Sequence, residues 1–250
     1  MKAMKLIFPA LLVLFFSVTA HAVTIGKKVT YDVGGKPYEG YLVMPSPNAP
    51  FILLIHDWDG LTDYEIKRAK MLANLGYAVF AADLFGAGIR PTEIRDKRRL
   101  TEELYKNRNK MRSLLYGALE TAKSKGANVH NGVAVGYCFG GAAVLELARS
   151  GADLKGFVTF HGVLSTPPGE DYSKTKGKLL ILHGTADESV SMDQFAELAK
   201  ELEKQGVPHE MITYGGAPHA FTVFGSGRYR EDADKKSWNR LTEFLSETLQ

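Results

Sequence analysis

The run Gly132-Val133-Ala134-Val135-Gly136-Tyr137-Cys138-Phe139-Gly140-Gly141 decides how this chain folds. Its apolar first part predicts a buried strand, and the residues after it predict a helix. The turn between them reads G-x-C-x-G. This matches the G-x-S-x-G turn that presents a nucleophile between a strand and a helix, with cysteine in place of serine. The alternative interpretation is a glycine-rich turn around a packed cysteine.

Asp187 and His219, which come later in the sequence, are the candidate partners of Cys138. Asp187 follows the predicted strand Leu179–Leu182, and His219 lies on a Gly/Pro loop after the predicted strand Glu210–Tyr214. Each residue alone could be an ordinary turn or loop residue. Together they keep the order nucleophile, acid, histidine, each after a strand. The sequence therefore predicts a triad in which His219 takes the thiol proton and Asp187 fixes the tautomer of His219.

The segment His56-Asp57-Trp58-Asp59-Gly60 follows the apolar strand Phe51–Ile55. In a fold of this type, the loop at this place supplies one backbone N–H to an oxyanion hole, and the residue after the nucleophile supplies the other. We therefore expect the N–H groups of Trp58 and Phe139 to form the hole. The same segment could bind a metal, but no second cluster with ligand spacing completes such a site, so we predict no metal.

The remaining pattern predicts one α/β domain over residues 23–250. The chain begins with a hairpin, in which Gly34-Gly35 separates two alternating strands. Apolar strands then alternate with helices, which predicts a mostly parallel sheet with helices on both faces and an antiparallel N-terminal hairpin. Helices are expected at 64–75, through a stretch from Leu104 to Ala122, and at 142–148, 192–205 and 233–249.

The N-terminus carries the pattern of a secretory signal peptide. Lys2 and Lys5 precede a short apolar run, and Ala20-His21-Ala22 matches a cleavage site for small residues. The alternative is an uncleaved membrane anchor, for which the run is short. We expect residues 1–22 to be removed and the mature protein to lie in the periplasm.

Composition limits the possible partners. The chain has 31 Lys and Arg against 28 Asp and Glu, and removing Lys2 and Lys5 with the leader lowers its formal charge from +3 to +1. This balance favours neither nucleic acid nor a membrane surface as a partner, so we expect a small-molecule substrate and favour a monomer. The single cysteine cannot form an internal disulfide.

The motifs together resemble the dienelactone hydrolase (carboxymethylenebutenolidase) family. The matching elements are G-Y-C-F-G-G at 136–141, H-D-W-D-G at 56–60, A-D-L-F-G at 82–86, H-G-T-A-D at 183–187 and A-P-H-A-F at 217–221. The resemblance implies an α/β-hydrolase fold, a triad of Cys138, Asp187 and His219, and hydrolysis of a cyclic enol ester through a thioester without a metal or organic cofactor. It also implies an acid beside the resting thiol, where Asp57 replaces the glutamate of founding members.

The chain departs from this family at the carboxylate-binding arginines. Val223 stands where founding members place an arginine four residues after the histidine. Arg228 lies nearby, and Arg98 in the charge-rich run 95–99 could provide the second arginine, although that run also fits a solvated face. A bidentate arginine selects strongly for a carboxylate. The absence of this arginine at position 223 therefore changes the substrate that we expect, but not the hydrolytic reaction.

Three functions are compatible with these patterns. The first is an ester or lactone hydrolase with Cys138 as nucleophile. The second is a ligand-binding protein on the same scaffold, because fold alone does not determine function. The third is a thiol redox protein, although the chain has no resolving cysteine.

Overall fold

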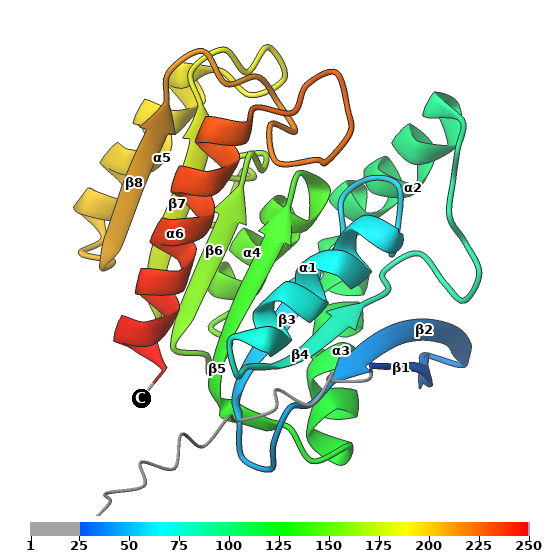
Figure 1. Ribbon diagram of the computed structural model, residues 1–250. Helices are drawn as coiled ribbons and strands as arrows, with labels where there is room; N and C mark the ends of the chain where they lie inside the picture. The colour runs from blue at the N-terminus through cyan, green and yellow to red at the C-terminus, as the bar shows by residue number, and fades with distance from the viewer. Residues whose placement is uncertain (1–25, 250) are drawn as a thin grey trace, which may run out of the picture.

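The computed structural model describes residues 26–249, which form one eight-stranded sheet in the order β1-β2-β4-β3-β5-β6-β7-β8 (Figure 1). The strands are β1 Lys27–Val33, β2 Lys36–Val43, β3 Pro50–Ile55, β4 Ala78–Ala82, β5 Asn128–Tyr137, β6 Gly156–Phe160, β7 Lys178–Gly184 and β8 His209–Tyr214. The helices are α1 Asp63–Asn74, α2 Ile94–Lys106, α3 Arg108–Ser124, α4 Phe139–Arg149, α5 Met192–Lys204 and α6 Glu231–Thr248.

The strand directions confirm the predicted sheet. β1 pairs antiparallel with β2, and β2 pairs antiparallel with β4, whereas every pairing from β4 to β8 is parallel. The hairpin turn has positive φ at both Gly34 (62°) and Gly35 (77°), which suits the twist of two-residue hairpins. Since parallel strands all end at one edge, the loops after β3, β5, β7 and β8 gather there.

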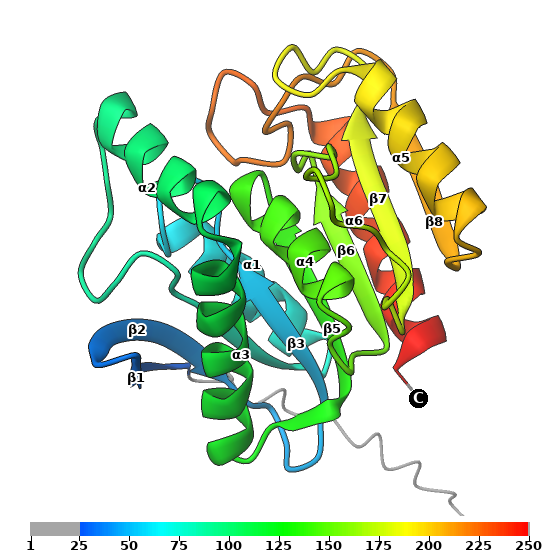
Figure 2. The ribbon, with the colours of Figure 1, turned by 180° about the vertical axis from the view of Figure 1, so that it is seen from behind.

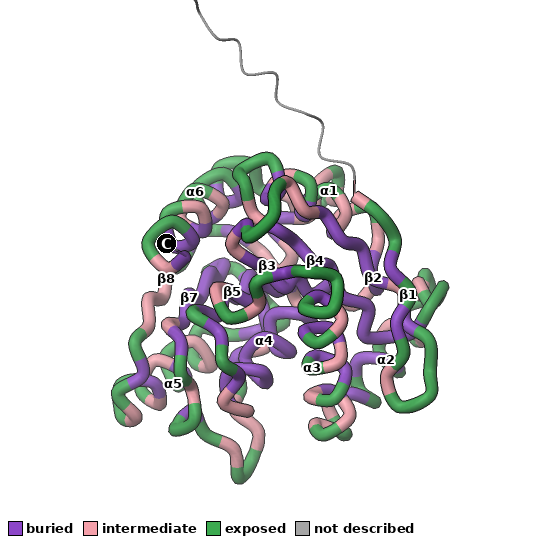
Figure 3. Tube along the Cα trace, turned by 90° about the horizontal axis from the view of Figure 1, so that it is seen from below, coloured by how far each residue is buried: buried purple, intermediate pink, exposed green. Residues whose placement is uncertain are grey.

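Helices cover both faces of the sheet. Figure 1 shows α1 and α6 on one face, and the reverse view in Figure 2 shows α2, α3, α4 and α5 on the other. Each face has its own apolar core, and the strands between them are buried on both sides, as β3 and β4 illustrate. Figure 3 shows the same arrangement by burial, with the strands inside and the outer helix faces exposed.

The helical stretch through Leu104 and Ala122 is two helices rather than one. Asn107 separates α2 from α3 with a non-helical backbone (φ −122°, ψ 76°). Its side chain accepts a hydrogen bond from the backbone N–H of Lys110, so it caps the second helix. This break turns α2 away from α3 and places α2 beside the edge where the parallel strands end (Figure 2).

The predicted signal peptide, residues 1–22, lies outside the described residues. Within residues 26–249, none of the helices has the length and apolar character needed to span a bilayer.

Candidate active site

Cys138 occupies the sharp turn between β5 and α4. Its backbone lies in a sparsely populated region (φ 53°, ψ −113°). The surrounding structure holds it there, because its N–H donates to Phe160 O (3.0 Å) and its carbonyl accepts from Gly141 N (3.0 Å). Strained backbone of this kind persists where neighbouring contacts determine it, and it directs the side chain away from the strand and helix axes.

The glycines beside Cys138 are required by close backbone packing. A Cβ on Gly136 would lie 2.1 Å from the carbonyl oxygen of Gly140. A Cβ on Gly140 would lie 2.4 Å from Ile55 O and 2.5 Å from His56 O. The turn is therefore packed directly against the end of β3 and the loop that follows it. These contacts explain why both positions of the G-x-C-x-G turn are glycine.

The structure brings Cys138, His219 and Asp187 into one hydrogen-bonded chain. His219 Nε2 lies 3.1 Å from Cys138 Sγ, and His219 Nδ1 lies 2.8 Å from Asp187 Oδ2. The other carboxylate oxygen of Asp187 accepts from the N–H groups of Ser189 (2.8 Å) and Val190 (2.9 Å). One oxygen thus fixes the loop, while the other orients the imidazole.

The hydrogen bonds and charges around His219 favour its protonated form. Burial lowers the pKa of His219, but hydrogen bonds and charges from Asp187 and Cys138 outweigh it and raise that pKa to about 10. Burial raises the pKa of Asp187, yet His219 and the Val190 and Ser189 amides lower it overall. At neutral pH His219 therefore carries a proton and Asp187 a negative charge. An imidazolium in this position is the natural partner of a thiolate.

A second histidine, His161, packs against the ring of His219. His161 is buried at the end of β6, and its ring centroid lies 5.3 Å from that of His219 in an edge-on arrangement. Its Nε2 is 2.9 Å from Thr222 Oγ1, while its Nδ1 has no hydrogen-bond partner. Burial, followed by the charge of His219, holds the pKa of His161 well below its usual range. His161 is therefore neutral and acts as a packing support.

A buried arginine fastens the loop of His219 to the helices on the same face. Arg68 on α1 donates to Thr222 O (2.8 Å) and forms a buried ion pair with Asp234 on α6. Tyr64 Oη is 2.7 Å from Thr222 Oγ1. Sequence patterns did not single out these residues, since Arg and Asp more than 160 positions apart carry no local signal of pairing.

The loop after β3 is rigid because His56 is buried within it. His56 Nδ1 donates to Asp57 O (2.6 Å), and His56 Nε2 accepts from the N–H of Leu84 (3.1 Å). Burial lowers the pKa of His56 to about 4, so it is neutral and both ring nitrogens are used. His56 therefore ties the loop after β3 to the loop after β4.

Two buried carboxyl groups lie in and below this loop. Burial raises the pKa of Asp57 to about 6, and burial together with the charge of Asp57 raises that of Glu65 to about 8. Glu65 accepts from the backbone N–H of Asp57 (3.3 Å), and Asp57 accepts from that of Asp59 (2.8 Å). The N–H groups of Trp58 and Phe139 take part in no hydrogen bond among the described residues, which leaves them available to a ligand.

Comparison with known proteins agrees with this geometry. The model of the dienelactone hydrolase family matches residues 38–249. The chain belongs to that family. It is 27% identical to Protein usf of Aquifex pyrophilus over 236 residues, which cover 90% of this chain and 100% of that protein.

Two solved structures superpose closely on this α/β-hydrolase. The structure named m3DLH is 30% identical, with a TM-score of 0.86, and the match covers 92% of this chain and 100% of that one. A dienelactone hydrolase-like promiscuous phosphotriesterase from metagenomic libraries is 27% identical, with a TM-score of 0.84 and the same coverage.

The arginines proposed to replace the family's carboxylate-binding pair lie on the surface. Arg98 is exposed on α2, and Arg228 is exposed in the loop between β8 and α6. Within residues 26–249, the side chains of Cys138, Asp187 and His219 make no hydrogen bond or ion pair with either arginine, so the substrate roles of Arg98 and Arg228 stay predictions. Lys97 is the charged residue of α2 that reaches the loop after β3. Its Nζ pairs with Asp59 (2.6 Å) and lies 5.3 Å from the Trp58 ring centroid.

Among the described residues, no group of three or more His, Cys, Asp or Glu side chains is arranged to hold a metal ion.

Proposed function

We propose that this α/β-hydrolase cleaves a carboxylic ester or lactone with Cys138 as nucleophile. The observation that carries the proposal is the chain of contacts from Cys138 Sγ through His219 to Asp187, at 3.1 and 2.8 Å. These are hydrogen-bond distances between a nucleophile, its base and the group that orients the base. A ligand-binding protein would need no such alignment.

In the first half of the reaction, the Cys138 thiolate attacks the substrate carbonyl carbon and forms a C–S bond. The carbonyl electrons move to oxygen, and the resulting oxyanion lies between the N–H groups of Trp58 and Phe139. When the tetrahedral intermediate collapses, the C–O bond breaks. The leaving alkoxide takes the proton from the His219 imidazolium, which yields an alcohol and a thioester.

In the second half, water replaces the alcohol. His219, now neutral, removes a proton from the water, which attacks the thioester carbonyl. The C–S bond breaks and Cys138 leaves as a thiolate. His219 again carries the proton, and the acid product departs. Asp187 stays ionised throughout and stabilises the imidazolium of the resting enzyme.

Asp57 is proposed to receive or hold the thiol proton before substrate binds. It is buried near the site, where the charge of His219 acts on it, and its raised pKa of about 6 allows it to exchange a proton near neutral pH. Asp57 occupies the position at which the family resemblance implies an acidic residue beside the thiol.

A hydrolysis panel tests the proposed reaction. The mature protein is assayed on p-nitrophenyl acetate and butyrate, a simple lactone, a dienelactone with a free carboxylate, and a p-nitrophenyl phosphotriester. The last substrate is included because one related structure is named as a phosphotriesterase. We expect turnover of the carboxylic esters or lactone that is lost after alkylation with iodoacetamide. Dienelactone preference would show that Val223 does not prevent carboxylate binding.

The control is Cys138→Ala, which removes the thiol but keeps the fold. We expect no turnover and an unchanged circular dichroism spectrum. Undiminished turnover in this variant would refute the triad. If the wild type hydrolyses nothing while Cys138 reacts readily with iodoacetamide, the binding and redox alternatives take precedence.

We also propose that the chain is exported to the periplasm and cleaved after Ala22. Support comes from the lysines, apolar run and Ala20-His21-Ala22 pattern of the leader. The mass of the protein purified from a periplasmic extract tests this. A mass that includes residues 1–22, or recovery only from the cytoplasm, would contradict it.

A further inference from the structure

Two of the buried acidic residues have no cationic partner, and they contact each other. Within residues 26–249, six acidic residues are buried: Asp57, Glu65, Asp83, Glu146, Asp187 and Asp234. Four of them pair with an arginine or a histidine, as Asp234 does with Arg68. Asp57 and Glu65 form no ion pair in this part of the chain. Instead, a carboxyl oxygen of Glu65 accepts a hydrogen bond from the N–H of Asp57.

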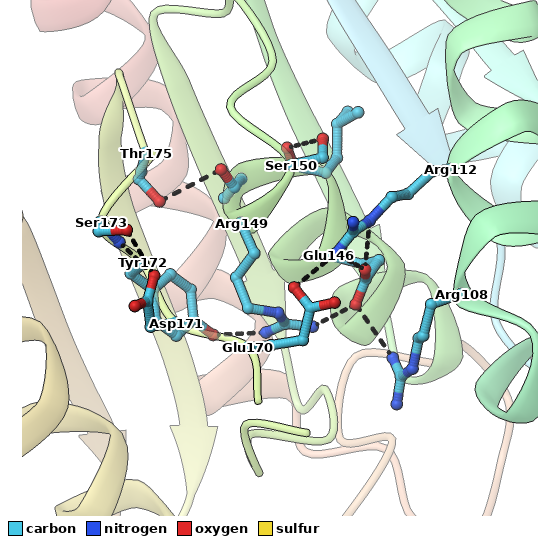
Figure 4. Close-up of polar contacts among 12 residues, drawn as sticks. Arg108, Arg112, Glu146, Arg149, Ser150, Glu170, Asp171, Tyr172, Ser173 and Thr175 are labelled. Carbon is cyan, nitrogen blue, oxygen red and sulfur yellow. Dashed lines mark hydrogen bonds and ion pairs between the residues drawn. The ribbon is translucent and has the colours of Figure 1, made fainter. Parts of the chain in front are cut away.

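Glu146 shows what usually accompanies a buried glutamate. Its carboxylate lies 2.6 to 3.3 Å from the guanidinium groups of Arg108, Arg112 and Arg149 (Figure 4). Burial raises the pKa of Glu146, but the arginines outweigh burial and lower that pKa overall. Glu65 is buried as deeply, and because no cation pairs with it, burial raises its pKa to about 8. An ionisable group left without a cation in the interior is costly, which indicates a role beyond packing.

The cap of α1 does not by itself account for a glutamate at position 65. Glu65 is the third residue of α1, and its Oε2 accepts from the backbone N–H and the hydroxyl of Thr62 (2.8 Å each). α5 has the same kind of cap at Ser191, where the third residue is the neutral Gln194. Glutamine therefore suffices for such a cap. Glu65 differs in its second oxygen, Oε1, which accepts from the N–H of Asp57 (3.3 Å).

Glu65 holds both ends of the loop that follows β3. Its Oε1 contacts the N–H of Asp57 at the start of the loop, and its Oε2 contacts that of Thr62 at the end. Trp58, whose N–H is proposed to bind the oxyanion, lies between these two contacts. One buried side chain therefore closes the loop that carries the proposed donor.

The contact with Asp57 helps to determine where the N–H of Trp58 points. A peptide unit is planar, so fixing the N–H and the C=O of one residue fixes both of its soft dihedral angles. Glu65 holds the N–H of Asp57, and His56 Nδ1 donates to the carbonyl of Asp57 (2.6 Å). The N–H of Trp58 belongs to the same trans peptide unit as that carbonyl and points the opposite way. Its direction therefore depends on Glu65 as well as on His56.

We infer that Glu65 is a positioning residue for the oxyanion hole: its carboxyl group holds the Asp57 amide and thereby aims the N–H of Trp58 at the substrate oxyanion. Glu65 is fully buried and acts through the loop rather than on the substrate. A donor stabilises the oxyanion most when its direction is fixed before the reaction. The inference rests on the proposed function and adds a residue to its machinery.

The variant Glu65→Gln separates the two contacts of Glu65. Its amide oxygen keeps the shorter contact, to Thr62, as Gln194 does at the cap of α5. The NH2 group then faces the N–H of Asp57, and two donors cannot bond, so the Asp57 amide is released while the cap remains. We expect kcat on the preferred ester to fall about 10- to 100-fold with little change in KM, because the oxyanion forms only in the transition state.

The matched control is Thr62→Val, which removes the capping hydroxyl and keeps the contact of Glu65 with Asp57. We expect a lower urea midpoint from the weakened cap, and a kcat within about twofold of the wild type. If kcat falls in proportion to the loss of stability in both variants, Glu65 has only a structural role and the inference is wrong. An unchanged kcat in Glu65→Gln also overturns it.

Hydrogen exchange distinguishes failure of this inference from failure of the proposed reaction. NMR measures exchange of the Asp57 amide without substrate, relative to the amides of β3, which report global opening. We expect Glu65→Gln to accelerate this exchange about tenfold or more, and Thr62→Val to change it less than about threefold. That result supports the positioning role even if no ester is hydrolysed. Equal exchange in the wild type and Glu65→Gln refutes the role and leaves hydrolysis by Cys138 unaffected.

Discussion

Two regions of the molecule near Cys138 are built in different ways. The rim consists of the loops after β5, β7 and β8, which carry Cys138, Asp187 and His219. The wall consists of α2 and α3. Among the rim side chains, that of Asp187 has no exposed surface, and those of Cys138 and His219 are partly buried. Wall side chains pair with one another near solvent, as Lys106 and Glu102 do. The rim side chains are therefore held in place by buried contacts, whereas the exposed ion pairs of the wall hold its side chains only weakly.

The largest expected effect is at the rim. In Asp187→Asn the side chain keeps its shape but loses the charge that stabilises imidazolium. It also presents the wrong hydrogen-bonding group to Nδ1 of His219. We expect kcat to fall by about 10³- to 10⁴-fold. Steady-state kinetics on the preferred ester measures this. A loss below tenfold would mean that the rim tolerates change as the wall does.

Substitution of a rim glycine should destabilise the fold. In Gly140→Ala, the added Cβ meets backbone carbonyls of Ile55 and His56, which cannot move independently of β3. We expect the free energy of unfolding to fall by about 3 kcal/mol. The control is Gly215→Ala, where nothing lies within 4 Å, and its effect should be within about 0.5 kcal/mol. Urea unfolding of both variants tests this, and equal effects would contradict the packing argument.

Stability should depend on pH through His219. The raised pKa of about 10 means that folding favours protonated His219. This contribution is complete below the unfolded pKa of about 6.5, declines as pH rises, and is lost above about pH 10. The difference in unfolding free energy between the wild type and His219→Gln should therefore shrink from pH 6 to pH 10. If urea unfolding gives a constant difference, the imidazolium assignment is wrong.

The smallest expected effect concerns the wall. Lys97→Gln removes the cation that contacts Asp59 and the Trp58 ring, so the loop of the proposed oxyanion hole loses one support. We expect kcat to fall by about two- to fivefold, in line with the small energy of a partly exposed pair. Arg95→Gln, an exposed neighbour on α2, should change kcat less than twofold. If the two variants have the same kcat, Lys97 does not support the loop of the proposed oxyanion hole.

Local pattern was sufficient for much of the fold and for the order of the triad. Alternation of apolar strands with helices determined the parallel sheet, and Gly34-Gly35 marked the hairpin. The glycines around Cys138 marked the turn, because close backbone packing permits no side chain at those positions. Such features depend on residues near one another in the chain, so a single sequence displays them.

The tertiary structure alone decided which distant side chains meet. Asn107 ended one helix and capped the next, although the apolar spacing continues across it. Arg68 pairs with Asp234, and His161 supports His219, because the sheet brings separate segments together. The exposed positions of Arg98 and Arg228 likewise follow from packing. Charged residues far apart in sequence have no periodicity that reveals their partners, so only the folded chain determines them.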